Sequence, residues 1–232
     1  MGDESEARRA SERGGAGLVR LGGAGVLVSI FVHAVVNWAL KEFPSPSLSE
    51  AQLDAYMTDQ LDTWAIVHGA RAVAVVGMVL FAAGLFERTS CRSDAARGWG
   101  VVGLLGTAML ATNLMITNGL ETLGYLGIDL LRQNQELFWL LRNVTRTLFT
   151  TELTSWVLVF VGFSVAGWLS RSMPRWLVLL GCASAVGAMV SVVFIVDTLG
   201  SGWTAAVAPV TGFAGMIWFG SLGVLMLIQG RK

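Results

Sequence analysis

Polar side chains suited to ligand binding lie inside segments of this sequence that are otherwise apolar. Arg71 follows His68 by one helical turn, within an apolar run long enough to cross a bilayer. An arginine deep in a membrane must be paired or hydrated, because its insertion costs about 2.5 to 3.5 kcal/mol even on lenient scales. The residues that we select as candidates for one ligand pocket are His33, Asn37, His68, Arg71, Asn113, Thr117, Glu121 and Glu152.

Arg71 requires a carboxylate partner. Glu152 is the first choice because the two side chains lie at the same estimated depth, and Glu121 is the second choice. Such a pair has three compatible roles: it fixes helix packing, it holds a ligand or relays protons, or it lines a water-filled cavity of no specific role.

His33 and His68 are the only histidines of the chain. Two facing imidazoles ligate a haem iron, and together with Glu152 or Glu121 they form a two-histidine, one-carboxylate metal site. No His-Glu-x-x-His motif supports these readings. We expect hydrogen-bonded histidines inside a helical bundle, and we retain a metal site of His33, His68 and Glu152, or a haem, as alternatives. No catalytic residue and no cofactor is assigned.

The elements that carry these side chains are apolar blocks of about 20 residues, the length that a membrane-spanning helix requires. Nearly all charges fall between the blocks, which is typical of an all-α polytopic membrane protein. Residues 1–16 are expected to form a disordered cytoplasmic tail, and residues 17–232 a single six-helix transmembrane domain. The amphipathic stretch 135–148 is expected to lie on the membrane surface before the fourth helix. The expected membrane helices are 18–40, 63–86, 99–116, 149–169, 176–196 and 204–229.

The distribution of basic residues predicts the orientation of the helices. Lysines and arginines are concentrated in the tail, the second and fourth loops and the C-terminus, whereas the other loops carry only Lys41, Arg132, Arg142 and Arg146. By the positive-inside rule, both termini are then cytoplasmic. We expect an inner-membrane protein of a bacterium with the lipid bilayer as its surroundings. The net charge of +0 gives no indication of nucleic-acid binding.

Depth estimates bring the candidate residues into one layer. Depth is counted from the inner membrane interface at about 1.5 Å per residue. On this count, four side chains on four different helices lie about 21 to 24 Å above that interface: His33, Arg71, Asn113 and Glu152. His68 and Thr117 lie about 27 Å up, and Asn37 and Glu121 lie close to the outer surface. Spacings of three or four residues place each helix's polar members on one face. The sequence therefore predicts a polar pocket that opens outward.

Three motifs in the second half of the chain are similar to those of a known family. They are Asn118-Gly-Leu-Glu121, Arg171-Ser-Met-Pro174-Arg-Trp-Leu177 with Gly181 behind it, and Pro209 with Trp218 and Gly223. This pattern resembles the bacterial six-helix membrane proteins grouped as domain of unknown function 4386. In these relatives an arginine often stands where this chain has Asn118. The resemblance implies six helices and a plasma-membrane location, and it supplies no activity.

Three functional hypotheses follow from the sequence. The first is a binding, sensing or accessory protein whose outward-facing pocket takes a small-molecule or lipid-like ligand. The second is an intramembrane enzyme or redox protein that uses His33, His68 and a carboxylate around a metal or haem. The third is a small transporter, which the absence of inverted repeats in the sequence disfavours. The sequence does not determine the oligomeric state.

Overall fold

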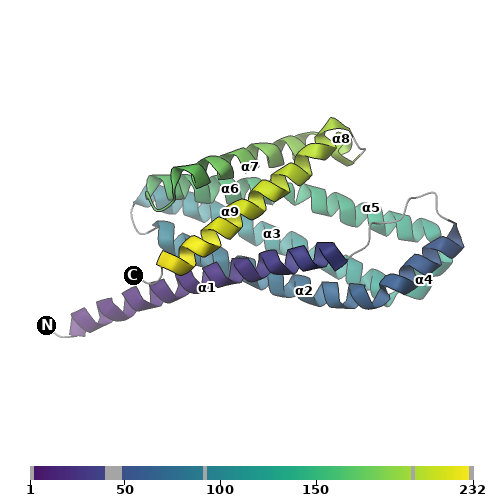
Figure 1. Ribbon diagram of the computed structural model, residues 1–232, viewed down its shortest axis with the longest axis horizontal. Coiled ribbons are helices and arrows are strands. Elements are labelled where there is room, and N and C mark those ends of the chain that lie inside the picture. The colour runs from purple at the N-terminus through teal and green to yellow at the C-terminus, as the bar shows by residue number, and fades with distance from the viewer. Residues whose placement is uncertain (1–2, 40–48, 91–92, 200–201, 230–232) are drawn as a thin grey trace.

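The computed structural model describes residues 3–39, 49–90, 93–199 and 202–229, and this part of the chain is helical and contains no β-strand (Figure 1). Its elements are α1 (Asp3–Ala39), α2 (Glu50–Ser90), α3 (Asp94–Leu126), α4 (Ile128–Gln133), α5 (Gln135–Thr151), α6 (Leu153–Leu169), α7 (Arg175–Val193), α8 (Ile195–Leu199), the short 3-10 helix η1 (Trp203–Ala206) and α9 (Val207–Gln229).

Within the described residues, six helical stretches are long and apolar enough to cross a membrane. The fourth combines α5 and α6, and the sixth combines η1 with α9. The prediction of an all-α chain with six apolar segments is therefore confirmed. The six stretches are Gly15–Val35, Asp62–Ser90, Asp94–Leu126, Gln135–Leu169, Arg175–Val193 and Trp203–Ile228.

The long helices pack as a closed ring. In order around the ring, α1 contacts α2, α2 contacts α3, α3 contacts α6, α6 contacts α7, and α7 contacts α9, which returns to α1. Figure 1 shows α9 lying across the bundle between α1 and α7. The contact between α9 and α1 closes the ring, so the first and last helices of the chain lie next to each other.

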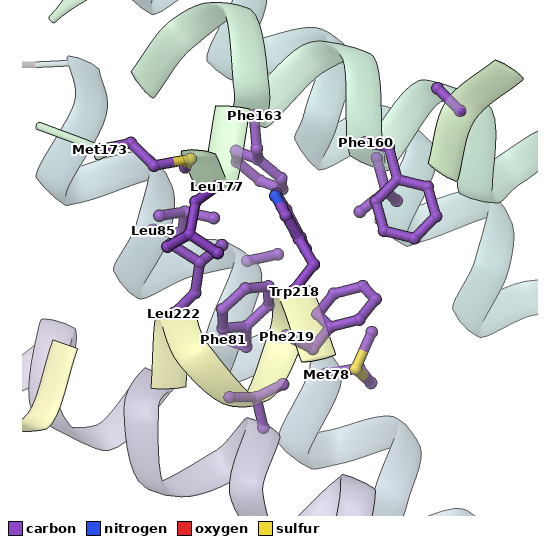
Figure 2. Close-up of a cluster of buried hydrophobic side chains, with 14 of the residues drawn as sticks. Met78, Phe81, Leu85, Phe160, Phe163, Met173, Leu177, Trp218, Phe219 and Leu222 are labelled. Atoms are coloured by element: carbon purple, nitrogen blue, oxygen red, sulfur yellow. The ribbon is translucent and has the colours of Figure 1, made fainter. Parts of the chain in front are cut away.

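Aromatic side chains fill the centre of the ring. Phe81 from α2 meets Phe219 from α9, with ring centroids 5.3 Å apart, and Trp218 lies 5.2 Å from Phe160 of α6 (Figure 2). All four are buried. These rings meet edge-on or at a tilt, the arrangements that aromatic quadrupoles favour, and they tie three helices together.

Small residues allow α1 and α2 to approach closely. A side chain at Gly25 would place its Cβ 2.7 Å from the backbone oxygen of Gly77, and one at Gly77 would collide with Gly25 and Ser29. The Ser29 hydroxyl also donates a hydrogen bond of 2.7 Å to the backbone oxygen of Ala74 across this contact. Van der Waals contact and a polar bridge therefore hold the pair.

Two helices extend further than the sequence suggests. α2 begins at Glu50 instead of 63, because Leu53 and Met57 bury their side chains against α4 and α5 outside the ring. α1 begins at Asp3, so the segment predicted as a disordered tail continues the first helix, as its helix-favouring Ala, Glu and Arg residues allow. Hydropathy marks the membrane-spanning part of a helix, and a helix can continue beyond that part.

The amphipathic pattern of α5 predicts a separate surface-lying segment, whereas in the structure α5 belongs with α6 to one candidate span, Gln135–Leu169. It continues the direction of α6 and packs on α3 (Figure 1). Its apolar side chain Phe138 is buried with Leu131 of α4 and with Leu53 and Met57 of α2. We call this assembly of α4 with the N-terminal parts of α2 and α5 the end cap. It lies at the end of the molecule opposite both termini (Figure 1).

Candidate functional site

The centre of the site is an ion pair between neighbouring helices. The Arg71 guanidinium of α2 binds the Glu121 carboxylate of α3, and both side chains are 26% exposed. The expectation that Glu152 is the first-choice partner is wrong, and the second choice is correct. Depth counting treats each helix as upright, whereas helix tilt and the length of the arginine side chain bring residues of different estimated depth together.

His68 stands beside this pair and has a defined tautomer. The Asn118 amide nitrogen donates to the backbone oxygen of His68 at 3.2 Å, which turns the amide oxygen toward the His68 ring nitrogen Nδ1 at 3.0 Å. Because an amide oxygen only accepts, Nδ1 carries the proton, and in the neutral ring Nε2 carries the lone pair. His68 Nδ1 also lies 3.9 Å from a Glu121 oxygen. One turn of α2 thus faces one turn of α3.

A cavity of about 50 Å³ lies between the helical ring and the end cap. This is room for a few water molecules or for part of a small ligand. Its walls combine the polar groups above with apolar and aromatic side chains from four helices. The lining residues are Trp64, Val67, His68, Arg71, Glu121, Gly124, Leu131, Phe138, Leu141, Arg142 and Thr145.

His68, which lines this cavity, has an unsatisfied side-chain atom. Its side chain is only 10% exposed, and the buried Nε2 has no hydrogen-bond partner in the part of the chain that the structure describes. A buried polar atom without a partner costs about 1 to 3 kcal/mol, so such atoms indicate water or a ligand. The free lone pair of Nε2 fits a molecule that presents an O–H or N–H group.

Glu152 and Thr117 are buried and do not line the cavity. The Glu152 side chain, at the junction of α5 and α6, is 2% exposed. Its Oε1 accepts a hydrogen bond of 2.9 Å from the Trp156 indole nitrogen, whereas Oε2 has no partner. The hydroxyl of Thr117 on α3 is also buried without a partner. These two predicted pocket residues are therefore buried outside the cavity.

The remaining candidates are not brought into the pocket. His33 on α1 donates Nδ1–H to the backbone oxygen of Ser29 at 3.2 Å, and neither His33 nor Asn113 lines the cavity. The side chain of Asn37 lies outside the described residues. Among the residues that the structure describes, no three His, Cys, Asp or Glu side chains form a group that could hold a metal ion. The proposed triad of His33, His68 and a glutamate is therefore not assembled.

The residues missing from the sequence-based selection include Trp64 and Arg142, which line the cavity, and Asn118, which bonds His68. Asn118 precedes Glu121 by three residues, which places it on the same helical face, and this spacing was an available signal. Arg142 belongs to the polar face of α5, whose position depends on the end cap. The place of Trp64 in the pocket depends on where α4 and α5 fold.

The fold and the site together define a class: an all-α protein with six apolar helices and, near one end of the bundle, a cavity whose largely apolar wall carries a few polar side chains. The sequence matches no protein-family model, and no curated protein or solved structure is significantly similar to it.

Proposed function

We propose that this chain is a multi-pass protein of a bacterial plasma membrane that binds a small-molecule or lipid-like ligand in the cavity beside His68, Arg71 and Glu121. In this role it is a binding, sensing or accessory component. The observation that carries the proposal is the His68 side chain, which lines the cavity and whose buried Nε2 has no hydrogen-bond partner among the described residues. An ion pair that only fixed helix packing would not require a neighbouring cavity with an unsatisfied acceptor.

An apolar groove favours a ligand with a hydrocarbon part. The groove lies between α1 and α2 and shares Val67 with the cavity. Its other lining residues include Phe31, Val35 and Ile66, and Phe31 and Ile66 are largely exposed. An acyl chain in this groove and a polar head group at the cavity would therefore lie next to each other along α2.

Native mass spectrometry of the purified full-length protein tests this proposal. We expect a bound non-protein mass that is lost in Leu141→Trp, which fills the cavity, and kept in Leu179→Trp, a matched change at an exposed position of α7. If the bound mass is also lost in Ile66→Trp, a change in the groove, the ligand is lipid-like. If Ile66→Trp keeps the bound mass, the ligand is a small molecule. Equal retention in Leu141→Trp and Leu179→Trp contradicts the proposal.

A weakly bound ligand requires a second readout. We expect a compound from a bacterial lipid extract or a metabolite library to raise the unfolding temperature of the natural sequence and not that of Leu141→Trp. If no bound mass is found and no compound separates these two proteins, the cavity has no ligand and the proposal fails.

We further propose that both termini are cytoplasmic and that the end cap faces outward. The support is the excess of lysine and arginine in the tail, the α2–α3 and α6–α7 connections and the C-terminus. The six apolar helices also agree with membership of the six-helix family that the motifs resemble, and this membership stays a prediction.

Cysteine labelling in intact cells tests the orientation. In a Cys91→Ser, Cys182→Ser background, we expect a membrane-impermeant maleimide to label Asp129→Cys in the end cap directly. Arg171→Cys, between α6 and α7, should be labelled only after the membrane is permeabilised. The reversed pattern would place the end cap in the cytoplasm.

A further inference from the structure

Glu152 is a buried carboxyl group that the proposed ligand pocket does not use. Its side chain is 2% exposed and it does not line the cavity. Only one of its two oxygens has a partner, the Trp156 indole nitrogen at 2.9 Å. An ionised carboxylate at such a position would carry a large desolvation cost, which is offset only by a cation or by several hydrogen bonds.

The surroundings do not supply that compensation. Among the described residues, no cation forms an ion pair with Glu152. Arg71 on α2 is the cation that we expect to act on Glu152 through its charge, and its guanidinium is bound to Glu121 of α3. On α5, Arg146 donates to the backbone oxygen of Leu199.

The other helices near Glu152 carry few titratable groups. Cys182 lies halfway along α7 and Arg175 is at its far end, and α9 has no titratable side chain. The carboxylate of α8, Asp197, accepts hydrogen bonds from Thr204. Arg142 on α5 lines the cavity with His68 and Glu121, and His33 on α1 is bonded to Ser29. Arg71 is therefore the charged group that matters most for Glu152.

We propose that Glu152 is a proton-binding site and that it carries its proton in the resting protein. The Arg71 guanidinium then pairs with a single ionised carboxylate, that of Glu121, and the positive and negative charges cancel. When Glu152 releases its proton, two carboxylates compete for Arg71, and the Arg71–Glu121 pair at the cavity is weakened. Proton occupancy of Glu152 is thereby linked to the geometry of the cavity wall. The proposal depends on Glu152 itself and does not require that the cavity binds a ligand.

Infrared spectroscopy of the full-length protein in lipid tests this proposal. At about pH 7 we expect the carbonyl band of a protonated carboxylic acid, shifted by deuterium exchange. The band should be lost in Glu152→Gln, shifted in frequency in Glu152→Asp, and unchanged in Glu136→Gln, a matched change at an exposed position of α5. Absence of the band, or its persistence in Glu152→Gln, overturns the proposal.

The link to Arg71 has its own test. In Glu121→Gln, Glu152 is the remaining carboxyl group for the Arg71 guanidinium. We expect the ratio of protonated to ionised Glu152 at the same pH to fall on the order of tenfold, as for a carboxyl group that gains a cationic neighbour. A band of unchanged intensity in Glu121→Gln would reject the coupling between Glu152 and the cavity wall.

Discussion

The guanidinium of Arg71 on α2 binds the carboxylate of Glu121 on α3, 50 positions further along the chain, and His68 and Asn118 repeat this offset one turn away. The two helices are neighbours, and one turn of each supplies all four side chains. A single helix–helix contact therefore places an ion pair and an imidazole, which an amide orients, at the wall of one cavity.

The strength of the Arg71–Glu121 pair can be measured with a double-mutant cycle. Arg71→Leu and Glu121→Leu should each lower the stability of the folded protein, and the double variant should recover part of the loss, because the unpaired charge is removed. We expect a coupling energy of about 1 to 3 kcal/mol in reversible unfolding measurements. The same cycle on Arg132 and Asp54 of the end cap, whose pair is more exposed, should give less than about 1 kcal/mol. Equal couplings would show that the lower exposure of the Arg71 pair does not strengthen it.

The tautomer of His68 is directly observable. Nitrogen-15 NMR of histidine-labelled protein should show Nδ1 protonated and Nε2 unprotonated, with a His33→Gln variant to assign the signals. In Asn118→Ala, Nδ1 loses its acceptor, so the tautomer ratio should change and stability should fall by about 1 kcal/mol. A His68 signal that is the same in Asn118→Ala would contradict the hydrogen bond.

Two glycine substitutions test the close contact of α1 and α2: Gly77 lies in the contact, and Gly119 on α3 is the control. Gly77→Ala places a Cβ against Gly25 and Ser29, so the helices must separate, and we expect a loss of about 1 to 3 kcal/mol. Gly119→Ala, on an exposed face of α3 with no atom within 4 Å of the new Cβ, should be neutral or stabilise by up to about 1 kcal/mol. Unfolding temperatures of the two variants compare these effects. Similar losses for both would argue against the contact.

Asp197, in the short helix α8, should give a pH dependence at acidic pH. Its pKa lies below the ordinary value of 3.8, because the hydroxyl of Thr204, at 2.6 Å, and its backbone N–H, at 3.1 Å, donate to the carboxylate. Since the folded-state pKa is the lower one, the carboxylate favours the folded state above the unfolded pKa, and this contribution is lost as pH falls through the folded value.

The pH dependence of the unfolding temperature is compared between the natural sequence and Asp197→Asn. The unfolding temperature of the natural sequence should decrease more steeply below about pH 4 than that of the variant. Thr198→Ala is a useful second variant, because Thr198 bonds Thr204 and leaves the carboxylate in place, so its acid dependence should remain. Parallel pH profiles for the natural sequence and Asp197→Asn would show that Thr204 does not stabilise the ionised form.

The helical segments could be predicted from the sequence, whereas the contacts between the helices were harder to predict. Blocks of apolar residues separated by charges gave the six helices, because hydropathy is a local property of the chain. The polar faces were also local, since residues three or four apart share one side of a helix. The end cap was not predicted, because Leu53, Met57 and Phe138 look unremarkable until α4 brings Leu131 between them.

The sequence by itself determined that this protein is built from six apolar helices carrying a few buried polar residues, since length and hydrophobicity along one segment are sufficient for that. Only the tertiary structure decided that Arg71 binds Glu121, that His68 lines a cavity, and that Glu152 forms no ion pair with any cation in the described part of the chain. The physical reason is that ion pairing and burial depend on helix tilt, side-chain reach and close contacts such as that of Gly25 with Gly77, which arise only when the helices pack.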